Sequence, residues 1–247
     1  MANKHGSAYP AHGRKEPVPF EVDVDVAVPE LLCEFFEIAI HAILYHRELY
    51  PSGIFERKKK YEVPVWIASH PAVQEYVANC VSGIKPFINN GSVRRLMIAI
   101  FSPHSRVPLE RFVFHLAPDD KKFSANLMAD KPSDSRKFYF EFGEALKAFM
   151  LKIAACKSYL KPLPPGCTCA LQIVTDVQTQ LEISEQESAA CFPWIVVDDR
   201  ERSMKEGGNL HLLRGPVEGV CPVEMYVEEA KNKLNAVVKS KISEETI

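Results

Sequence analysis

The sequence predicts an α+β fold, in which helices pack on an antiparallel sheet, and three features support this class. Residues 29–50 form a segment that is apolar around most of a helical circumference. Two further segments, residues 70–91 and 138–160, repeat apolar residues at helical spacing. Two short apolar runs between them, residues 96–101 and 109–116, are joined by a short turn, which favours antiparallel pairing.

The segment 29–50 is the predicted core helix, around which the other elements pack. Its polar residues recur at spacings of three, four or seven and form one narrow stripe: Glu30, Glu34, Glu37, His41 and Glu48. A helix that is apolar elsewhere is buried on more than one side. Pro29 suits the first helical position and Pro51 ends the run. The glutamates in the middle of the segment argue against a membrane span.

The two other helices have clear ends. The first opens at His70-Pro71 and closes at Asn89-Asn90-Gly91, whose residues tolerate a left-handed backbone. Its apolar face is Val73, Tyr76, Val77, Cys80, Val81, Ile84 and Phe87. The helix 138–160 has its own apolar face and stops before Pro162.

Several short segments have the pattern of strands. In 109–116 the apolar Phe112 and Phe114 alternate with Arg111 and His115, so one face of the meander is covered. Further strands are predicted from apolar runs or alternation, and these are residues 21–26, 63–67, 167–174 and 223–227. Residues 192–197 are one more apolar run. The polar residues 117–137 are expected to form a long mobile loop.

Arg57 to Lys60 are four adjacent basic residues with two readings. They suit a localisation signal or a phosphate-binding patch. The reading we favour is a solvated turn that leads into the strand 63–67.

Length and composition bound the organisation and the class of protein. With 247 residues and 47% hydrophobic composition, the chain has enough apolar material for one sizeable core or at most two small ones. We predict a disordered tail at 1–20, one domain at 21–230 and a second tail at 231–247. A net charge of −2 lacks the basic footprint of a protein that grips nucleic acid directly. The N-terminus has no signal-peptide pattern, and seven cysteines without framework spacing fit reduced thiols in the cytosol or nucleus.

Motifs that carry catalysis or bind cofactors are missing from the sequence. No two glycines are separated by a single residue, and no GxxxxGK is present, so the usual nucleotide-binding loops are excluded. Cys167 and Cys169 lack a second pair that would complete a metal site. His41 and His46 are about 140° apart on a helix and do not share one face. We therefore predict no enzyme, no cofactor and no metal, with a cysteine nucleophile kept as an alternative.

Two aromatic residues have two readings. Trp194 follows a proline between polar loops, and Tyr76 lies on the helix 70–91. Both residues fill the core in the simpler reading. In the functional reading they form an aromatic wall for a proline-containing peptide, because proline stacks well on Trp and Tyr rings.

Several stretches of the sequence closely resemble the HORMA-domain family, and within it the accessory subunits of DNA polymerase zeta. The resemblance covers about residues 28–230. It is carried by LCEFFEIAIHAILYHRELYPSGIFERKKKYEVPV (32–65), LKAFMLKI (146–153), PPGCT (164–168), FPWIVVDD (192–199) and MYVEE (225–229).

This resemblance implies three helices on an antiparallel sheet, with a C-terminal "safety belt" at about 175–230 that closes over a bound peptide. It implies a non-catalytic adaptor in translesion DNA synthesis, with roles in double-strand-break repair and cell-cycle control, in the nucleus and also the cytoplasm. The implied partners are the catalytic subunit of polymerase zeta, the Rev-one C-terminal domain, a shieldin component, activators of the anaphase-promoting complex, a second HORMA protein and a remodelling AAA+ ATPase. The alternative within the family is a spindle-checkpoint protein of the Mad-two type.

The resemblance also implies three sets of site residues. Tyr76 and Trp194 line the path of the partner peptide. Leu210, Glu224 and Tyr226 form the surface for Rev-one, with Glu224 where the family has glutamine. Arg57 and Lys147 lie in the dimerisation face, with Lys147 where arginine is expected.

Overall fold

The structure is a computed structural model, and it describes residues 28–103, 107–116, 135–175 and 208–231, together with six single residues: Thr179, Trp194, Ile195, Val197, Met204 and Lys233. Several sequence-based expectations lie outside the described residues. These are the tail 1–20, the strand 21–26, most of the loop 117–137 and most of the first half of the belt.

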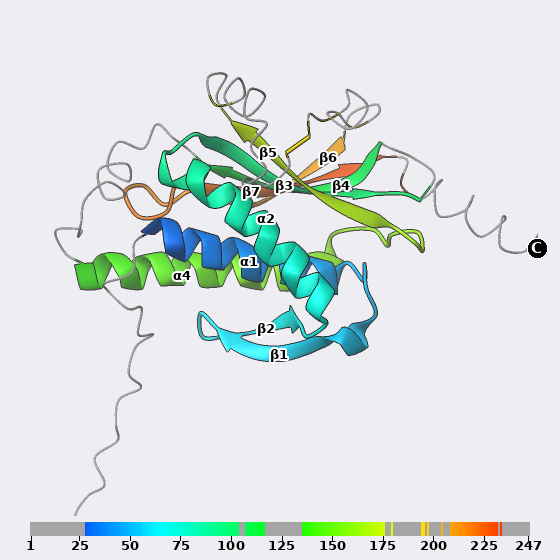
Figure 1. Cartoon of the computed structure of the whole chain (residues 1–247), viewed down its shortest axis with the longest axis horizontal. Helices are drawn as coiled ribbons and strands as arrows, with labels where there is room; N and C mark the ends of the chain where they lie inside the picture. Colours follow the sequence, from blue (N-terminus) through cyan, green and yellow to red (C-terminus); the bar gives the residue numbers. More distant parts are fainter. Residues whose placement is uncertain are drawn as a thin grey trace, which may run out of the picture.

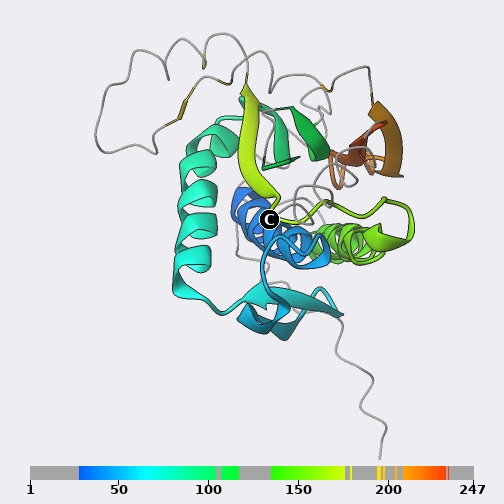
Figure 2. The same cartoon turned by 90° about the vertical axis from the view of Figure 1, so that its right-hand side faces the viewer.

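Three helices lie on one face of a five-stranded antiparallel sheet (Figures 1 and 2). The helices are α1 (Val28–His46), α2 (Pro71–Asn89) and α4 (Ser135–Ala154). The strand order is β5-β3-β4-β7-β6, with bounds β3 Val93–Phe101, β4 Pro108–Leu116, β5 Thr168–Thr175, β6 Gly208–Arg214 and β7 Val223–Ala230. Every neighbouring pair in this sheet is antiparallel. The α+β fold predicted from sequence is confirmed.

A small separate hairpin covers α1 on the side away from the sheet (Figure 1). Its strands are β1 (Phe55–Lys60) and β2 (Val63–Ala68), and the 3-10 helix Ser52–Ile54 leads into it. A second 3-10 helix, Cys156–Ser158, follows α4. Helix α1 therefore lies between the hairpin and the sheet, with α2 and α4 beside it.

Helix α1 is the core helix, as predicted. Thirteen of its nineteen residues are buried, which requires neighbours around most of its circumference. Two residues of its polar stripe pair with other elements at the surface: Glu34 with Lys60 at 2.6 Å and Glu30 with Lys85 at 2.8 Å. His41 of the same stripe is buried, and the cost of burying its charged form lowers its pKa to about 4.

The predicted extension of α1 to Tyr50 is wrong, because the helix ends at His46. Glu48 takes a left-handed backbone conformation, with φ of 55°. The Leu49 N–H then bonds to the Leu44 carbonyl and the Glu48 N–H to the Tyr45 carbonyl, at 3.1 and 3.0 Å. This is a Schellman cap, which usually holds glycine at the position of Glu48.

The basic run 57–60 is a strand, so its interpretation as a turn is wrong. Tyr61 and Glu62, with φ of 49° and 60°, form the two-residue turn of a β-hairpin. The residues of β1 after Phe55 are exposed, so their charges face solvent. The hairpin is held on the core by β2, which packs on α1. Lysine on such an exposed edge discourages pairing with other chains.

The remaining elements agree with the sequence at most positions. Helix α2 and the pair β3–β4 have the predicted places, and α4 begins and ends earlier than predicted. Strand β6 was not predicted. At its first residue, Gly208, an added Cβ would lie 3.0 Å from the Met204 sulfur and 3.1 Å from the Glu229 carbonyl oxygen.

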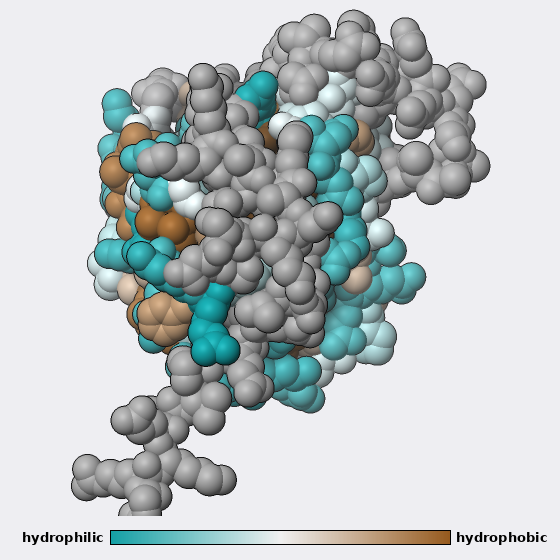
Figure 3. Space-filling view, turned by 90° about the vertical axis from the view of Figure 1, so that its left-hand side faces the viewer, coloured by the Kyte–Doolittle hydropathy of each residue, from teal (hydrophilic) through white to brown (hydrophobic). Residues whose placement is uncertain are grey.

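The described helices include none long and apolar enough to cross a membrane. The face seen in Figure 3 mixes hydrophilic and apolar areas.

A cluster of phenylalanine rings joins α1 to the sheet and to α4. The Phe35 ring lies 5.8 Å from Phe114 of β4, edge-on, and 5.6 Å from Phe149 of α4. Phe36 adds a contact with Phe114 at 5.5 Å. All four rings are almost fully buried. Edge-to-face pairs of this kind stabilise a core beyond the area that they bury.

We predict that Phe35→Ala lowers the free energy of unfolding by about 3–5 kcal/mol, because it leaves a cavity between three elements. Chemical denaturation monitored by circular dichroism measures this. The matched control is Phe140→Ala on α4, where the ring is 49% exposed and the expected loss is about 0.5 kcal/mol or less. Equal losses in the two variants would contradict the central role of Phe35.

Candidate functional site

The outer edge of β5 is open in the part of the chain that the structure describes. Strand β5 pairs with β3 on one side, from Thr168 opposite Phe101 to Thr175 opposite Val93, and it stands last in the strand order. Backbone groups alternate in direction along an antiparallel strand, so about half of those in β5 point away from β3. An edge of this kind is a template for one more strand.

Helix α2 forms a wall beside this edge. Tyr76, Cys80, Gly83 and Phe87 are spaced so that they fall on one stripe of the helix. The stripe turns toward β5, because Tyr76 and Cys80 line a small pocket together with residues of that strand. The rest of the lining is Ile40, Val77, Ile98, Cys169, Ala170 and Leu171. The pocket is therefore an apolar recess next to open backbone groups.

Tyr76 lies with its hydroxyl at the strand and its ring partly in solvent. The hydroxyl lies near the Cys80 thiol and the backbone of Leu171, and the residue is 40% exposed. Burial of this hydroxyl raises the pKa of Tyr76, so the group is neutral at physiological pH. A neutral phenol with an exposed ring face suits contact with an apolar or proline side chain.

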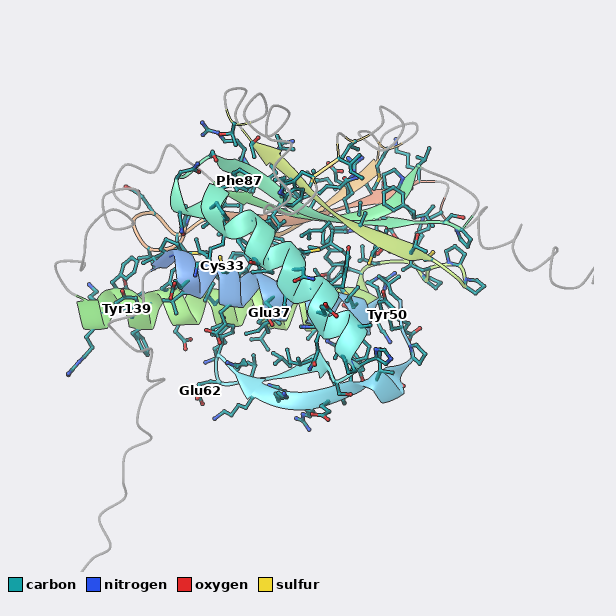
Figure 4. The ribbon with its side chains drawn as sticks, in the orientation of Figure 1. Cys33, Glu37, Tyr50, Glu62, Phe87 and Tyr139 are labelled. Carbon is teal, nitrogen blue, oxygen red and sulfur yellow. The ribbon has the colours of Figure 1, made fainter. Side chains whose placement is uncertain are left out.

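Trp194 lies at the far end of the same stripe of α2. Its ring centroid is 6.4 Å from that of Phe87, in an edge-on arrangement, and the residue is half-buried. Figure 4 shows Phe87 near the C-terminal end of α2. Tyr76 and Phe87 are eleven positions apart, which is about 16 Å along a helix, the length of about five residues of extended chain. The two predicted aromatics thus mark the ends of one track.

The chain connects opposite edges of the sheet after β5. Strand β5 ends at Thr175 on one edge and β6 begins at Gly208 on the other. Trp194 belongs to this connection and contacts α2, on the β5 side. Both ends of the connection are therefore held in the sheet, and Trp194 places one point of it beside α2.

The second set of predicted residues lies on the sheet face that points away from the helices. Leu210 of β6 is opposite Glu228 of β7, and Tyr226 and Glu224 follow on the same face of β7. Leu212, opposite Tyr226, belongs to this surface and was missed, although it alternates with Leu210. Leu210 and Leu212 are 65% and 63% exposed, an unusual level for adjacent leucines.

Ion pairs frame this surface along β4. His115 Nδ1 lies 3.3 Å from a Glu224 carboxylate oxygen, and Arg111 lies 3.3 Å from Glu228. We call Leu210, Leu212, Glu224 and Tyr226 the outer-face patch. The structure brings all three predicted residues of this set together.

The third set is divided between two elements. Arg57 is exposed on β1, opposite Trp66 in the hairpin. Lys147 lies on α4 and hydrogen-bonds to Glu144 of the same helix at 3.1 Å. The structure gives these residues no shared contact in the part of the chain it describes, so their role in dimerisation stays a prediction.

The described thiols are poor nucleophiles. Burial raises the pKa of Cys33, Cys167, Cys169 and Cys221 to about 11 in each case. The described residues include no cluster of three or more potential metal ligands. A cysteine nucleophile needs a lowered pKa, so the alternative of a cysteine enzyme gains no support from these residues.

Comparison with known proteins gives the family. The family model for the HORMA domain matches residues 29–186. The chain belongs to the HORMA domain family. The resemblance predicted from the sequence is confirmed.

Named relatives place the chain in one branch of that family. It is 34% identical over 206 residues to zebrafish (Danio rerio) "Mitotic spindle assembly checkpoint protein MAD2B", covering 83% of this chain and 92% of that protein. The human protein of the same name is 33% identical with the same coverage. The Arabidopsis thaliana "DNA polymerase zeta processivity subunit" is 32% identical over 174 residues, 70% of this chain and 74% of that protein.

Solved structures show the same fold at low sequence identity. A chain of the mitotic checkpoint complex has a TM-score of 0.64 at 21% identity, covering 81% of this chain and 97% of its own. Caenorhabditis elegans HTP-2 bound to the HIM-3 closure motif has a TM-score of 0.61 at 10% identity, covering 83% and 92%. At these identities the likeness supports the HORMA fold.

We predict that alkylation of Cys169 at pH 7.4 is about a hundredfold slower than that of an ordinary thiol, because the pKa raised to about 11 keeps it protonated. The rate should rise about tenfold per pH unit, since thiolate accumulates as pH approaches the raised pKa. Mass spectrometry after timed labelling measures each site separately. Fast labelling of Cys169 at neutral pH would contradict the burial of this thiol beside Tyr76.

Proposed function

We propose that this protein is a non-catalytic adaptor that binds an extended, proline-containing segment of a partner as an added strand on the open edge of β5. The observation that carries the proposal is the combination of this edge with Tyr76 and Trp194 along one stripe of α2. Backbone hydrogen bonds to β5 supply affinity in this mode, and pockets for alternate side chains supply selectivity.

The aromatic ends of the track favour proline in the bound segment. A proline ring stacks on Tyr and Trp, and its fixed backbone angle reduces the conformational entropy lost on binding. Each proline also lacks an N–H, so it is tolerated only where the added strand faces away from β5. The expected ligand therefore has prolines at the two ends of the track.

The connection between β5 and β6 makes slow dissociation the expected kinetic behaviour. If the connection closes over the bound peptide, as proposed for the belt, the peptide leaves only when the connection or the β6–β7 hairpin moves. The dissociation rate is then set by local unfolding rather than by the contact area.

Within this role, we assign the protein to the accessory subunits of DNA polymerase zeta, also known as Rev-seven or Mad-two-B. The proposal is supported by relatives named as MAD2B and as a polymerase zeta processivity subunit. The captured segment then belongs to the catalytic subunit of that polymerase or to a shieldin component, in a nuclear and partly cytoplasmic protein that acts in translesion synthesis and break repair. The outer-face patch is proposed to bind the Rev-one C-terminal domain.

Further partners belong to the proposal through the same family. These are activators of the anaphase-promoting complex, a second HORMA protein that pairs through the face of Arg57 and Lys147, and a AAA+ ATPase that remodels the belt. Each requires its own binding measurement.

A second candidate is a spindle-checkpoint adaptor of the Mad-two type. Relatives named as checkpoint proteins support it, including the Dictyostelium discoideum protein MAD2A at 28% identity. Competition between a checkpoint peptide and a polymerase-zeta peptide for the β5 edge separates the two roles. Preference for the checkpoint peptide would decide for this candidate.

We predict that Trp194→Ala weakens binding of a proline-containing polymerase-zeta peptide by about 2–4 kcal/mol, because a half-buried aromatic anchor is lost at one end of the track. Isothermal titration calorimetry measures the affinity. Ile195→Ala is the matched control, since this neighbour is 86% exposed and should bind as the unmodified protein does. Unchanged affinity in a folded Trp194→Ala protein would remove this residue from the site.

We predict that Leu212→Ala and Tyr226→Ala each weaken binding of the Rev-one C-terminal domain by about 1–3 kcal/mol, because both side chains are central in the outer-face patch. Binding of the polymerase-zeta peptide should not change, since the patch lies on β6 and β7 and the peptide edge is β5. Surface plasmon resonance with both ligands measures this. Leu151→Ala, a 51% exposed leucine on α4, is the control for loss of an exposed apolar side chain. A loss of Rev-one binding as large in Leu151→Ala would refute the location of the site.

A further inference from the structure

Four charged side chains are buried together where β7 joins the rest of the fold. They are Arg47, which directly follows α1, Glu110 of β4, Glu229 of β7 and Lys233, with exposures of 6%, 0%, 1% and 0%. Buried charges are costly unless they are paired and hydrogen-bonded. One pair lies within the main body of the fold, which we define as the elements from α1 to β5. The other pair belongs to the C-terminal hairpin, which is β6, β7 and the residues that follow them.

The first pair belongs entirely to the main body. The Arg47 guanidinium donates to both oxygens of Glu110, from Nε at 2.8 Å and from Nη2 at 2.7 Å. Arg47 also donates to the Lys161 carbonyl oxygen at 2.8 Å. This pair is neutral in sum and is complete without β6 or β7.

The second pair arrives with the C-terminal hairpin. Glu229 accepts from Lys233 at 3.0 Å, four residues further along the chain, and from the Lys161 N–H at 2.8 Å. The Lys233 ammonium also donates to Glu110 and, at 2.5 Å, to the Lys161 carbonyl. His211 of β6 lies 3.2 Å from the other oxygen of Glu229. Lys233 thus lies within the buried contacts although the sequence placed it in a tail.

We propose that these two pairs form an ionic latch, which allows the β6–β7 hairpin to dock on β4 and to leave it as a unit. The physical reason is charge balance. When the hairpin leaves, Glu110 retains Arg47, and Glu229 and Lys233 leave together as neighbours at i and i+4. Neither state contains an unpaired buried charge.

The latch makes docking depend on residues beyond the last strand. Without Lys233 the docked state holds two carboxylates and one guanidinium, and therefore a net negative charge in the interior. Without the charge of Glu229 it holds a net positive charge. Either imbalance opposes docking, whereas loss of both charges restores the balance.

The latch also bears on release of a bound peptide, because the hairpin anchors one end of the connection that starts at β5. This consequence rests on the proposed function. The latch itself does not, since docking of the hairpin is measured without any peptide.

Hydrogen–deuterium exchange on the full-length protein tests the latch with three variants: Lys233→Met, Glu229→Gln and the double variant. Each single variant is expected to accelerate amide exchange in β7 by about a hundredfold, because it leaves one buried charge unpaired. The double variant is expected to exchange within about tenfold of the unmodified protein. Amides of β3 serve as the internal reference and should not change. Lys231→Met is the matched control, since Lys231 is exposed two residues from Lys233.

Each outcome of the exchange experiment either supports the latch or overturns it. Rescue in the double variant, with acceleration confined to β6 and β7, supports the latch. Equal acceleration in β3 and β7, additive losses in the double variant, or unchanged exchange in the single variants overturns it. If a single variant does not fold, a folded double variant supports the latch and an unfolded one overturns it.

Discussion

The pairing of β7 with β4 determines which edge of the sheet is available. A five-stranded antiparallel sheet has two edges, and in this order they belong to β5 and β6. Because the C-terminal hairpin occupies the β4 side, the β5 side is open beside the α2 stripe as far as the described residues show. The position of the hairpin therefore decides where an added strand fits. That edge is the one beside Tyr76, Trp194 and the pocket between α2 and β5.

Helix α1 fixes the position of the α2 stripe relative to β5 through its contacts with the surrounding elements. It contacts the hairpin β1–β2, both other helices and, through Phe35 and Phe36, strand β4. Ile40 of α1 also reaches the floor of the pocket between α2 and β5. Since α2 packs on the same helix, the distance between the Tyr76 wall and the β5 edge is fixed by a packed core rather than by loops.

The sequence predicted those parts of the fold whose information is local. Helix α2 is bounded by Pro71 and Asn90-Gly91, and in β4 Phe112 and Phe114 alternate with Arg111, Val113 and His115, so both were placed correctly. Strand β1 was missed because its residues are nearly all charged, and β6 because it opens with glycine and stands next to residues without a strand pattern. The residues alone left two readings of Tyr76 and Trp194 open, a core role or an aromatic wall for a peptide, and the family resemblance favoured the wall. The ionic latch left no local pattern, since Arg47 and Lys233 lie 63 and 123 residues from Glu110.

The two proposed binding surfaces are linked by the same hairpin. The outer-face patch takes Leu210 and Leu212 from β6 and Glu224 and Tyr226 from β7, while His115 and Arg111, which pair with glutamates of β7, belong to β4. A ligand that contacts both β4 and β7 binds only the docked hairpin and therefore stabilises it, by the reciprocity that governs any pair of linked equilibria. The docked hairpin in turn holds one end of the connection that starts at β5. Under the proposed function and the proposed latch, an occupant of the outer face would therefore slow release from the β5 edge without touching it, and the charge balance around Glu110 would set how large that effect is.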